Sequence, residues 1–332
     1  MHQATLAAAF FDTSHLVVAM CSAGIALFLI AALAARREIA EARGLDKLVA
    51  LSNLCYAIPL GVFSMLHFFG PEFVKDLVPK YMPWRMFWVY LVGCALLSAS
   101  LSVAARIAVR WSGLLVGILM FTFVAMIYLP SGLRHFDARF TWTIVFRESS
   151  FGGAGWLLAG AAINGWPGWA KRTLIIVGGV CVTLALIFFA IEQVLHPMGL
   201  PGVPLRQDMP AWVPGRVVIG YLTGAALLVA AGSVLLQWKT REVTASVAGW
   251  ILLTILVIYT PFMFGALLSP GTEVKVVGIN YFADTLLFAG VILALARAAP
   301  QFAAMEWASV PSSAGDMASP TRAGSSASSA QK

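Results

Sequence analysis

Long runs of hydrophobic residues, separated by short clusters of polar residues, cover most of the chain. Several of them approach the roughly 20 residues that a helix needs to cross a bilayer. They lack the short alternating segments that are typical of a membrane β-barrel. The pattern therefore predicts an all-α integral membrane protein with about nine membrane-spanning helices, over residues 16–35, 46–69, 86–109, 112–131, 143–163, 173–195, 214–236, 246–268 and 277–297.

Two of these runs contain nearly the same sequence. MPWRMFWVYLVGCALL, starting at Met82, and VPGRVVIGYLTGAALL, starting at Val213, align without a gap and share Pro-x-Arg followed by Tyr-Leu-x-Gly. A weaker match, between FSMLHFFGP at Phe63 and FAIEQVLHP at Phe189, lies on the preceding helices. Spans two to five and six to nine are therefore interpreted as two copies of a four-helix unit. The copies are parallel, because each begins and ends on the same side of the membrane.

The repeat divides the chain into four expected parts. They are an additional N-terminal helix (1–41), a first four-helix unit (42–168), a second four-helix unit (169–299) and a C-terminal tail (300–332). The tail is rich in Ser and Ala and is expected to be disordered. No basic segment precedes the first apolar run, which favours a retained helix over a cleaved signal peptide.

Composition supports the membrane assignment. Hydrophobic residues make up 60% of the chain and charged residues 11%, whereas soluble domains carry about 25% charged residues. The lipid bilayer is therefore an expected partner. The net charge of +7 does not indicate nucleic-acid binding, because the basic residues stand singly or in pairs at the ends of apolar runs. The four cysteines all lie inside apolar runs and are expected to be buried free thiols.

Basic residues in the short loops predict the orientation. The loop after the first span carries Arg36, Arg37, Arg43 and Lys47, and such loops are usually cytoplasmic. We therefore expect the N-terminus outside and the C-terminal tail in the cytoplasm, in a bacterial inner (plasma) membrane.

Polar groups inside the spans are candidate functional residues, because a charge near the bilayer centre costs at least about 2.5 kcal/mol. In the predicted orientation they gather in the outer half, and the inner halves contain almost no ionisable groups. This asymmetry predicts one or two polar pockets that open outward and are closed below by apolar packing. The candidate acid–base residues are His67 and Glu148. The candidate ligand-binding residues are Arg85, Tyr90, Arg147, Glu192, Gln193, Arg216, Tyr221, Asn280 and Asp284.

Each candidate also has a purely structural interpretation. Arg85 and Arg216 could extend to lipid phosphates, and Arg147 could form a structural ion pair with Glu148. Glu148 could instead pair with Arg85. No two of the five histidines share the i, i+4 spacing of a helical metal site, so no metal site is predicted.

HFFGPEFVKDLVPKYMPWRMFWVYLVGCALL, starting at His67, resembles the DoxX-like family of four-helix membrane proteins. The family pattern is a helix that ends in His and is followed by Pro, an amphipathic segment, and a helix with Tyr-x-x-Gly. LLVGILMFTFVAMIYLPSGL resembles the third helix of that family. The resemblance covers residues 46–163, and the second unit keeps only the Pro-x-Arg and Tyr-Leu-x-Gly core. Family members often carry Glu where this chain has Leu96 and Leu227.

This resemblance implies redox work near the quinone pool of the membrane. Family members include DoxD-type subunits of thiosulfate:quinone oxidoreductases and MauE-type proteins that help to mature periplasmic redox enzymes. The first hypothesis is therefore a protein that binds a quinone or another amphipathic molecule, whether or not it is itself an enzyme. The alternative is a non-enzymatic accessory factor for a membrane or periplasmic redox partner. A small-molecule transporter is a third hypothesis, which the lack of inner polar groups disfavours.

Overall fold

The computed structural model describes residues 14–162 and 165–307, and within these ranges the chain is almost entirely helical. The described part has no β-strand beyond an isolated bridge between Gly199 and Asp208. Two helices are interrupted by a π-helical turn: α7 (Val109–Phe123), η1 (Val124–Tyr128) and α8 (Leu129–Arg134), and then α12 (Thr240–Thr254), η2 (Ile255–Tyr259) and α13 (Thr260–Leu267). The other long helices are α2 (His15–Glu41), α4 (Ser52–Phe69), α6 (Arg85–Ala104), α9 (Arg139–Ala162), α10 (Gly168–Leu195), α11 (Arg216–Leu235) and α14 (Thr272–Trp307). Two short helices are α3 (Asp46–Ala50) and α5 (Pro71–Lys75).

These helices confirm the predicted all-α, membrane-spanning fold. In the described residues, eight helical segments are long and apolar enough to cross a membrane. The 24-residue α9 packs in the same bundle, although its sequence is less apolar because it contains Arg147, Glu148 and several glycines. Helices at the edge of the bundle expose large apolar side chains, such as Ile25 and Phe28 of α2. A surface of this kind suits lipid rather than water.

The helix bounds repeat along the chain. α11 begins at Arg216, 131 residues after α6 begins at Arg85, and both helices are 20 residues long. α7 and α12 follow at the same offset, and each has 15 residues and is succeeded by a five-residue π-helix. The turns before α7 and α12 share an unusual left-handed backbone, with φ of 60° at Arg106 and 50° at Gln237. The sequence repeat therefore corresponds to a repeat in backbone structure.

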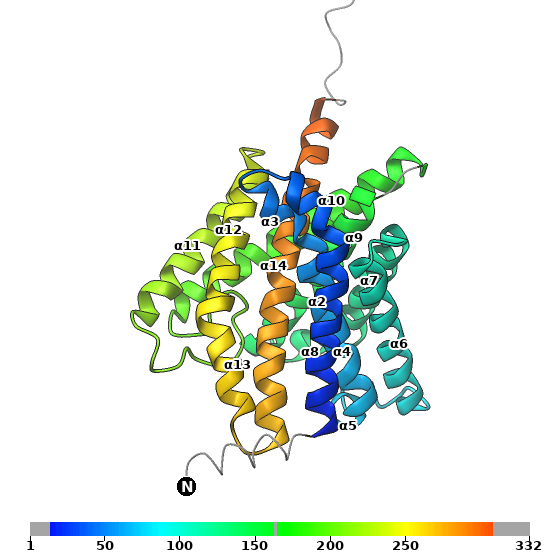
Figure 1. The fold of residues 1–332 in the computed structure, drawn as a ribbon, viewed down its shortest axis with the longest axis vertical. Helices are drawn as coiled ribbons and strands as arrows, with labels where there is room; N and C mark the ends of the chain where they lie inside the picture. Colours follow the sequence, from blue (N-terminus) through cyan, green and yellow to red (C-terminus); the bar gives the residue numbers. More distant parts are fainter. Residues whose placement is uncertain (1–13, 163–164, 308–332) are drawn as a thin grey trace, which may run out of the picture.

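The two four-helix units close into one ring. Within each unit, consecutive helices pack side by side, and the last helix of each unit packs against the first helix of the other, α9 on α10 and α14 on α4. α9 and α14 also contact each other, so an approximate two-fold axis passes between them. α2 lies outside this ring against α4 and α6 (Figure 1).

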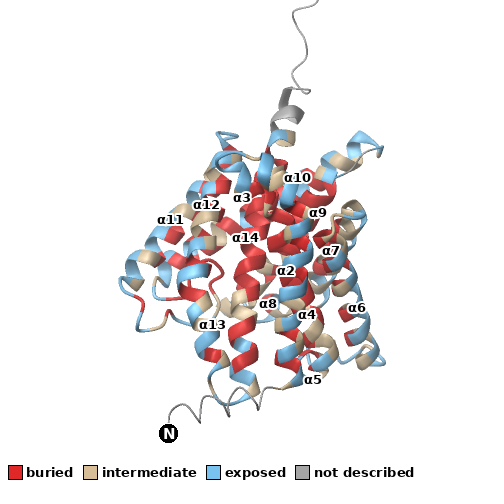
Figure 2. Cartoon of the chain, viewed as in Figure 1, coloured by how far each residue is buried: buried red, intermediate tan, exposed pale blue. Residues whose placement is uncertain are grey.

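Buried residues concentrate on the helices nearest this axis. Figure 2 shows them mainly on α4, α9, α10 and α14. Glycines allow close approach there: a Cβ on Gly153 of α9 would lie 2.8 Å from the carbonyl oxygen of Gly178 of α10. In lipid, where the hydrophobic effect does not drive helices together, such small-residue contacts are a principal source of packing.

The end of the bundle that carries α3, here called the α3 end, contains a network of ion pairs. Glu38 of α2 accepts hydrogen bonds from Arg106 and, at 2.7 Å, from Arg297 of α14. Arg241 of α12 pairs with Asp46 of α3 at 2.8 Å. These residues flank the apolar runs, and their long side chains reach back to carbonyl groups at the helix ends.

The described chain begins at the opposite end, here called the α5 end, where α2 starts (Figure 1). At its other extremity α14 continues to Trp307, past Ala299, where we expected the tail to begin. The remainder of the predicted tail, residues 308–332, lies outside the described residues, as do residues 1–13.

We expect Gly153→Val to lower the thermal stability of the purified protein, because the added side chain has no room between α9 and α10. Overpacking of this kind costs about 1–3 kcal/mol. Gly232→Val on α11 is the matched control, since no neighbouring atom lies within 4 Å of its added Cβ. Thermal unfolding in detergent measures both variants, and equal melting temperatures would contradict this packing.

Candidate functional site

Three charged side chains meet between α9 and α14. The Nη2 atom of Arg147 donates to Oε1 of Glu148 at 2.7 Å, and its Nη1 atom donates to Oδ2 of Asp284 at 3.0 Å. The exposed fraction is 16% for the Arg147 side chain and 10% for each carboxylate. We call these three residues the central cluster. Because one guanidinium faces two carboxylates, the central cluster is rich in hydrogen-bond acceptors.

The repeat explains why the cluster lies at the axis. Gly153 of α9 packs against α10, and Gly290 of α14 packs against α4, so we align the two glycines by their packing, at an offset six residues longer than that of the preceding helices. Counting back six residues from each leads to Arg147 and Asp284. The two units therefore place oppositely charged residues at equivalent positions, where the central helices meet.

A third element, η1, brings Tyr128 to the cluster. Pro130 follows Tyr128 closely, and a proline inside a helix disrupts the hydrogen bond to the carbonyl four residues earlier. The chain responds with a wider turn, in which the N–H of Leu129 bonds to the carbonyl of Val124. Such π-helical turns are frequent at functional sites. Tyr128 comes within electrostatic reach of all three residues of the central cluster.

Apolar residues close the cluster toward the α3 end. On the α3 side of Asp284, the side chains of α14 are almost wholly inaccessible, including those of Leu287, Phe288 and Ile292. Phe288 also packs edge-on against Phe189 of α10, with ring centroids 5.2 Å apart. Along α14, the residues between Asp284 and Arg297 at the α3 end are all apolar except Thr285.

Asn280 lies one turn from Asp284 on α14, on the side nearer the α5 end. Residues four apart share a helix face, so its amide points the same way as the carboxylate. Its Oδ1 atom is buried and has no hydrogen-bond partner in the described structure. An unsatisfied buried acceptor is rare in proteins and is a plausible contact for a ligand donor.

The structure thus brings together four of the residues that the sequence identified, namely Arg147, Glu148, Asn280 and Asp284. It places Glu192 and Gln193 in a different group on α10. Glu192 accepts a hydrogen bond from Arg139 of α9, and Gln193 donates to the carbonyl of Gly199 at 3.3 Å. These contacts join α10 to α9 and to the linker that follows it.

His67, Arg85 and Tyr90 lie at the α5 end of the first unit, with no contact to Glu148 in the described structure. The Nδ1 atom of His67 lies 2.8 Å from the carbonyl oxygen of Phe63. Arg85 donates to the carbonyl of Val78 at 3.2 Å and also bonds the carbonyl of Lys75 and the carboxylate of Asp76, thereby holding the linker before α6. Tyr90 lies at the surface of the bundle, where 42% of the residue is exposed.

The second unit repeats this arrangement on the other side of the bundle. Arg216 donates to the carbonyl of Met209 at 3.2 Å, which has the same seven-residue separation as Arg85 and Val78. Tyr221 is 49% exposed. Figure 1 shows α6 and α11 at opposite edges of the bundle, so these two Arg–Tyr pairs occupy two distant places. Because both pairs recur at the beginning of a helix, we interpret them as holding the start of α6 and of α11 against the preceding linker.

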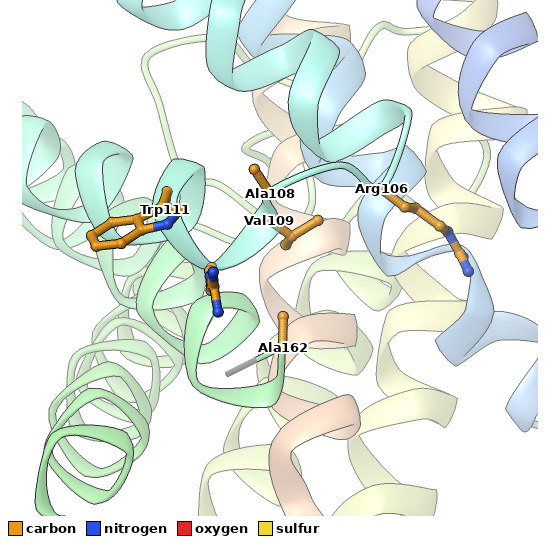
Figure 3. Close-up of a pocket in the computed structure, with 6 residues that line it drawn as sticks. Arg106, Ala108, Val109, Trp111 and Ala162 are labelled. Carbon is orange, nitrogen blue, oxygen red and sulfur yellow. The ribbon is translucent and has the colours of Figure 1, made fainter. Parts of the chain in front are cut away.

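A surface hollow of about 440 Å³ lies at the α3 end, beside the turn between α6 and α7. Figure 3 shows that Arg106 and Trp111 point away from each other there. Arg106 forms an ion pair with Glu38. The residues that line the hollow are Arg106, Ala108, Val109, Arg110, Trp111 and Ala162. None of them has a carboxylate, an imidazole or a nucleophilic side chain. Among the described residues, no group of three or more His, Cys, Asp or Glu side chains could hold a metal ion.

Tyr128 and its counterpart Tyr259 were not among the candidate residues predicted from the sequence. A signal was available: Ile-Tyr-x-Pro occurs at Ile127 and again at Ile258, at the 131-residue offset of the main repeat. A tyrosine inside an apolar run attracts less attention than a charge, because it is common in membrane helices.

Comparison of the chain with models of protein families, with curated proteins and with solved structures finds no match in any of the three. The resemblance to the DoxX-like family therefore stays a prediction, based on the sequence motifs alone.

We expect Arg147→Met to destabilise the protein strongly, because Glu148 and Asp284 lose their common partner. Removal of one member of a buried ion pair costs about 3–5 kcal/mol. Lys75→Met is a suitable control, because Lys75 and Glu72 form an exposed pair, and exposed pairs contribute at most about 1 kcal/mol. Thermal unfolding in detergent compares them. Adding Asp284→Asn to Arg147→Met should restore part of the loss, and equal effects of Arg147→Met and Lys75→Met would contradict this description.

Proposed function

We propose that this chain is a membrane protein of redox metabolism that binds the polar head of a quinone, or of a chemically similar amphipathic molecule, at the central cluster. The observation that carries the proposal is a nearly buried guanidinium between two carboxylates, adjoined by Tyr128 and closed on one side by apolar residues. Ionisable groups at such positions in a membrane bundle are functional candidates by default.

The chemistry of the cluster suits both redox states of a quinone head. The oxidised form presents two carbonyl oxygens, which accept hydrogen bonds, and Arg147 and Tyr128 can donate. The reduced form presents two hydroxyl groups, which donate, and Glu148 and Asp284 can accept. The carboxylates are also placed to take up protons from the reduced head when a partner protein removes its electrons.

The apolar packing on the α3 side favours a binding site over a transport path. A transporter of two parallel repeats needs access to its site from both sides in turn. Here the side chains of α14 on the α3 side of the cluster, such as Leu287, Phe288 and Ile292, are almost inaccessible. The sequence resemblance to the DoxX-like family supports the same proposal, because it implies work near the quinone pool.

The two Arg–Tyr pairs at the edges of the bundle are competing locations for the head group. They are Arg85 with Tyr90 on α6, and Arg216 with Tyr221 on α11. Arg85 already donates to backbone carbonyls of its linker, and its counterpart Arg216 does the same. Tyr90 and Tyr221 are half exposed on the outer faces of α6 and α11. The central cluster is therefore the better candidate, and a direct comparison of variants distinguishes the two.

We expect a short-chain benzoquinone, titrated into the protein in nanodiscs, to bind saturably and to bind the Arg147→Lys variant much more weakly. Lysine keeps the positive charge but cannot donate to two carboxylates and a ligand in the planar arrangement of arginine. Loss of a charge-assisted hydrogen bond corresponds to roughly a tenfold or greater loss of affinity. Quenching of tryptophan fluorescence by the quinone provides the readout.

The combined variant Arg85→Ala and Tyr90→Phe is the matched comparison and should keep the wild-type affinity. Loss of binding in that variant, with normal binding in Arg147→Lys, would move the site to the outer face of α6. Absence of saturable binding in the wild type would overturn the quinone proposal. The chain would then be better explained as an accessory factor, and co-purification with a redox partner would be the next measurement.

A further inference from the structure

The linker between α10 and α11 enters the bundle. It spans residues 196–215 and is five residues longer than the equivalent linker of the first unit, residues 70–84. All six residues from 199 to 204, with the sequence GLPGVP, are buried. In the first linker only Gly70 and Val74 are buried, and the other residues are partly or fully exposed. Backbone without helical structure is tolerated deep in a membrane bundle only where protein surrounds it or where it lines a cavity.

Specific contacts hold this segment in the second unit. The hydroxyl of Tyr259, at the end of η2, donates to the carbonyl oxygen of Pro201 at 2.7 Å. Gly202 has a φ of +106°, which residues other than glycine rarely adopt. A Cβ added to it would lie 3.5 Å from both Ile251 and Thr285. The segment therefore lies between α12 and α14, next to the π-helical tyrosine.

The repeat identifies the equivalent place in the first unit. By the 131-residue offset, Tyr128 corresponds to Tyr259. By the alignment of Gly153 with Gly290, Glu148 corresponds to Thr285. The place that the segment fills in the second unit thus corresponds, in the first unit, to the side of Tyr128, which lies within electrostatic reach of Glu148 of the central cluster.

The first unit's own linker does not enter the equivalent position, because most of its residues are partly or fully exposed. The linker 70–84 is held outside by Arg85, which bonds its carbonyl groups. In the described structure, no backbone or side-chain group forms a hydrogen bond with the Tyr128 hydroxyl, whereas Tyr259 donates to the carbonyl of Pro201.

We propose that residues 199–204 are a built-in occupant of the second unit's site, so that each chain has a single ligand site, on the Tyr128 side. This inference rests on the proposed function and deepens it. The carbonyl of Pro201 accepts a hydrogen bond from Tyr259 just as a ligand carbonyl would accept one from Tyr128. The ligand class is therefore one with a carbonyl oxygen on a flat or slender apolar body, as in an oxidised quinone head.

Two matched variants test the inference, because they remove the same hydroxyl group from equivalent tyrosines. Tyr128→Phe should weaken binding of a short-chain benzoquinone about fivefold, the usual effect of one lost hydrogen bond, and leave the Tm unchanged. Tyr259→Phe should have the opposite pattern, with unchanged affinity and a lower Tm, because the buried carbonyl of Pro201 loses its donor. Equal effects of the two variants on both measurements would overturn the inference.

Stoichiometry provides a second test. Native mass spectrometry of the wild-type protein with the benzoquinone should give one molecule per chain. Deleting residues 200–204 shortens the second linker to the length of the first and should add a second molecule. Two molecules bound to the wild type would refute the built-in occupant while leaving the proposed function in place.

A labelling experiment does not depend on any ligand. In a background without the four native cysteines, Tyr128→Cys and Tyr259→Cys are compared for their rates of reaction with N-ethylmaleimide. We expect faster labelling at position 128, and deletion of residues 200–204 should raise the rate at position 259 toward that of position 128. Equal rates with the intact linker would overturn the inference even if no quinone binds, whereas absence of quinone binding with unequal rates would overturn only the proposed function.

Discussion

The fold depends on the bonds that Arg147 makes to two carboxylates on the axis of the bundle. A charge removed from water is stable only when it is paired and hydrogen-bonded, so Arg147, Glu148 and Asp284 must stay together. Because Arg147 belongs to one four-helix unit and Asp284 to the other, their bond fixes the register of α9 against α14. α9 and α14 also contact the first helix of the opposite unit, so their mutual position constrains the position of the neighbouring helices of the ring.

Duplication provides the ring, and divergence between the copies provides the central cluster. Elements present in both copies have structural roles: Arg85 and Arg216 hold their linkers, and Pro130 and Pro261 end their π-helical turns. The positions at the axis differ instead, since an Arg in one unit faces an Asp in the other. A perfectly symmetric pair of like charges at that point would repel, so an ion pair on the axis requires the two copies to differ.

The sequence was sufficient for the spans and the repeat, because apolar length and ungapped similarity are both read along the chain. It also identified Arg147, Glu148, Asn280 and Asp284 as polar groups in apolar surroundings. It offered a pairing of Arg147 with Glu148 but did not predict that Asp284 joins them, because a helix that is apolar all round has no periodic pattern to show which face turns inward. The buried position of residues 199–204 was missed for a related reason. Gly and Pro indicate a turn, and they do so equally for a turn at the surface and for one inside the bundle.

The most conspicuous motif of the chain, Pro-x-Arg with Tyr-Leu-x-Gly, is separate from the central cluster. Repetition made Arg85, Tyr90, Arg216 and Tyr221 stand out, yet a feature that recurs in both copies is one that both copies need in order to fold. The proposed site lies where the copies differ: Glu148 is aligned with Thr285, and Tyr128 lies near charges whereas Tyr259 is bonded to the chain itself. For a duplicated membrane protein, differences between aligned copies therefore point to candidate sites that the repeated motif does not mark.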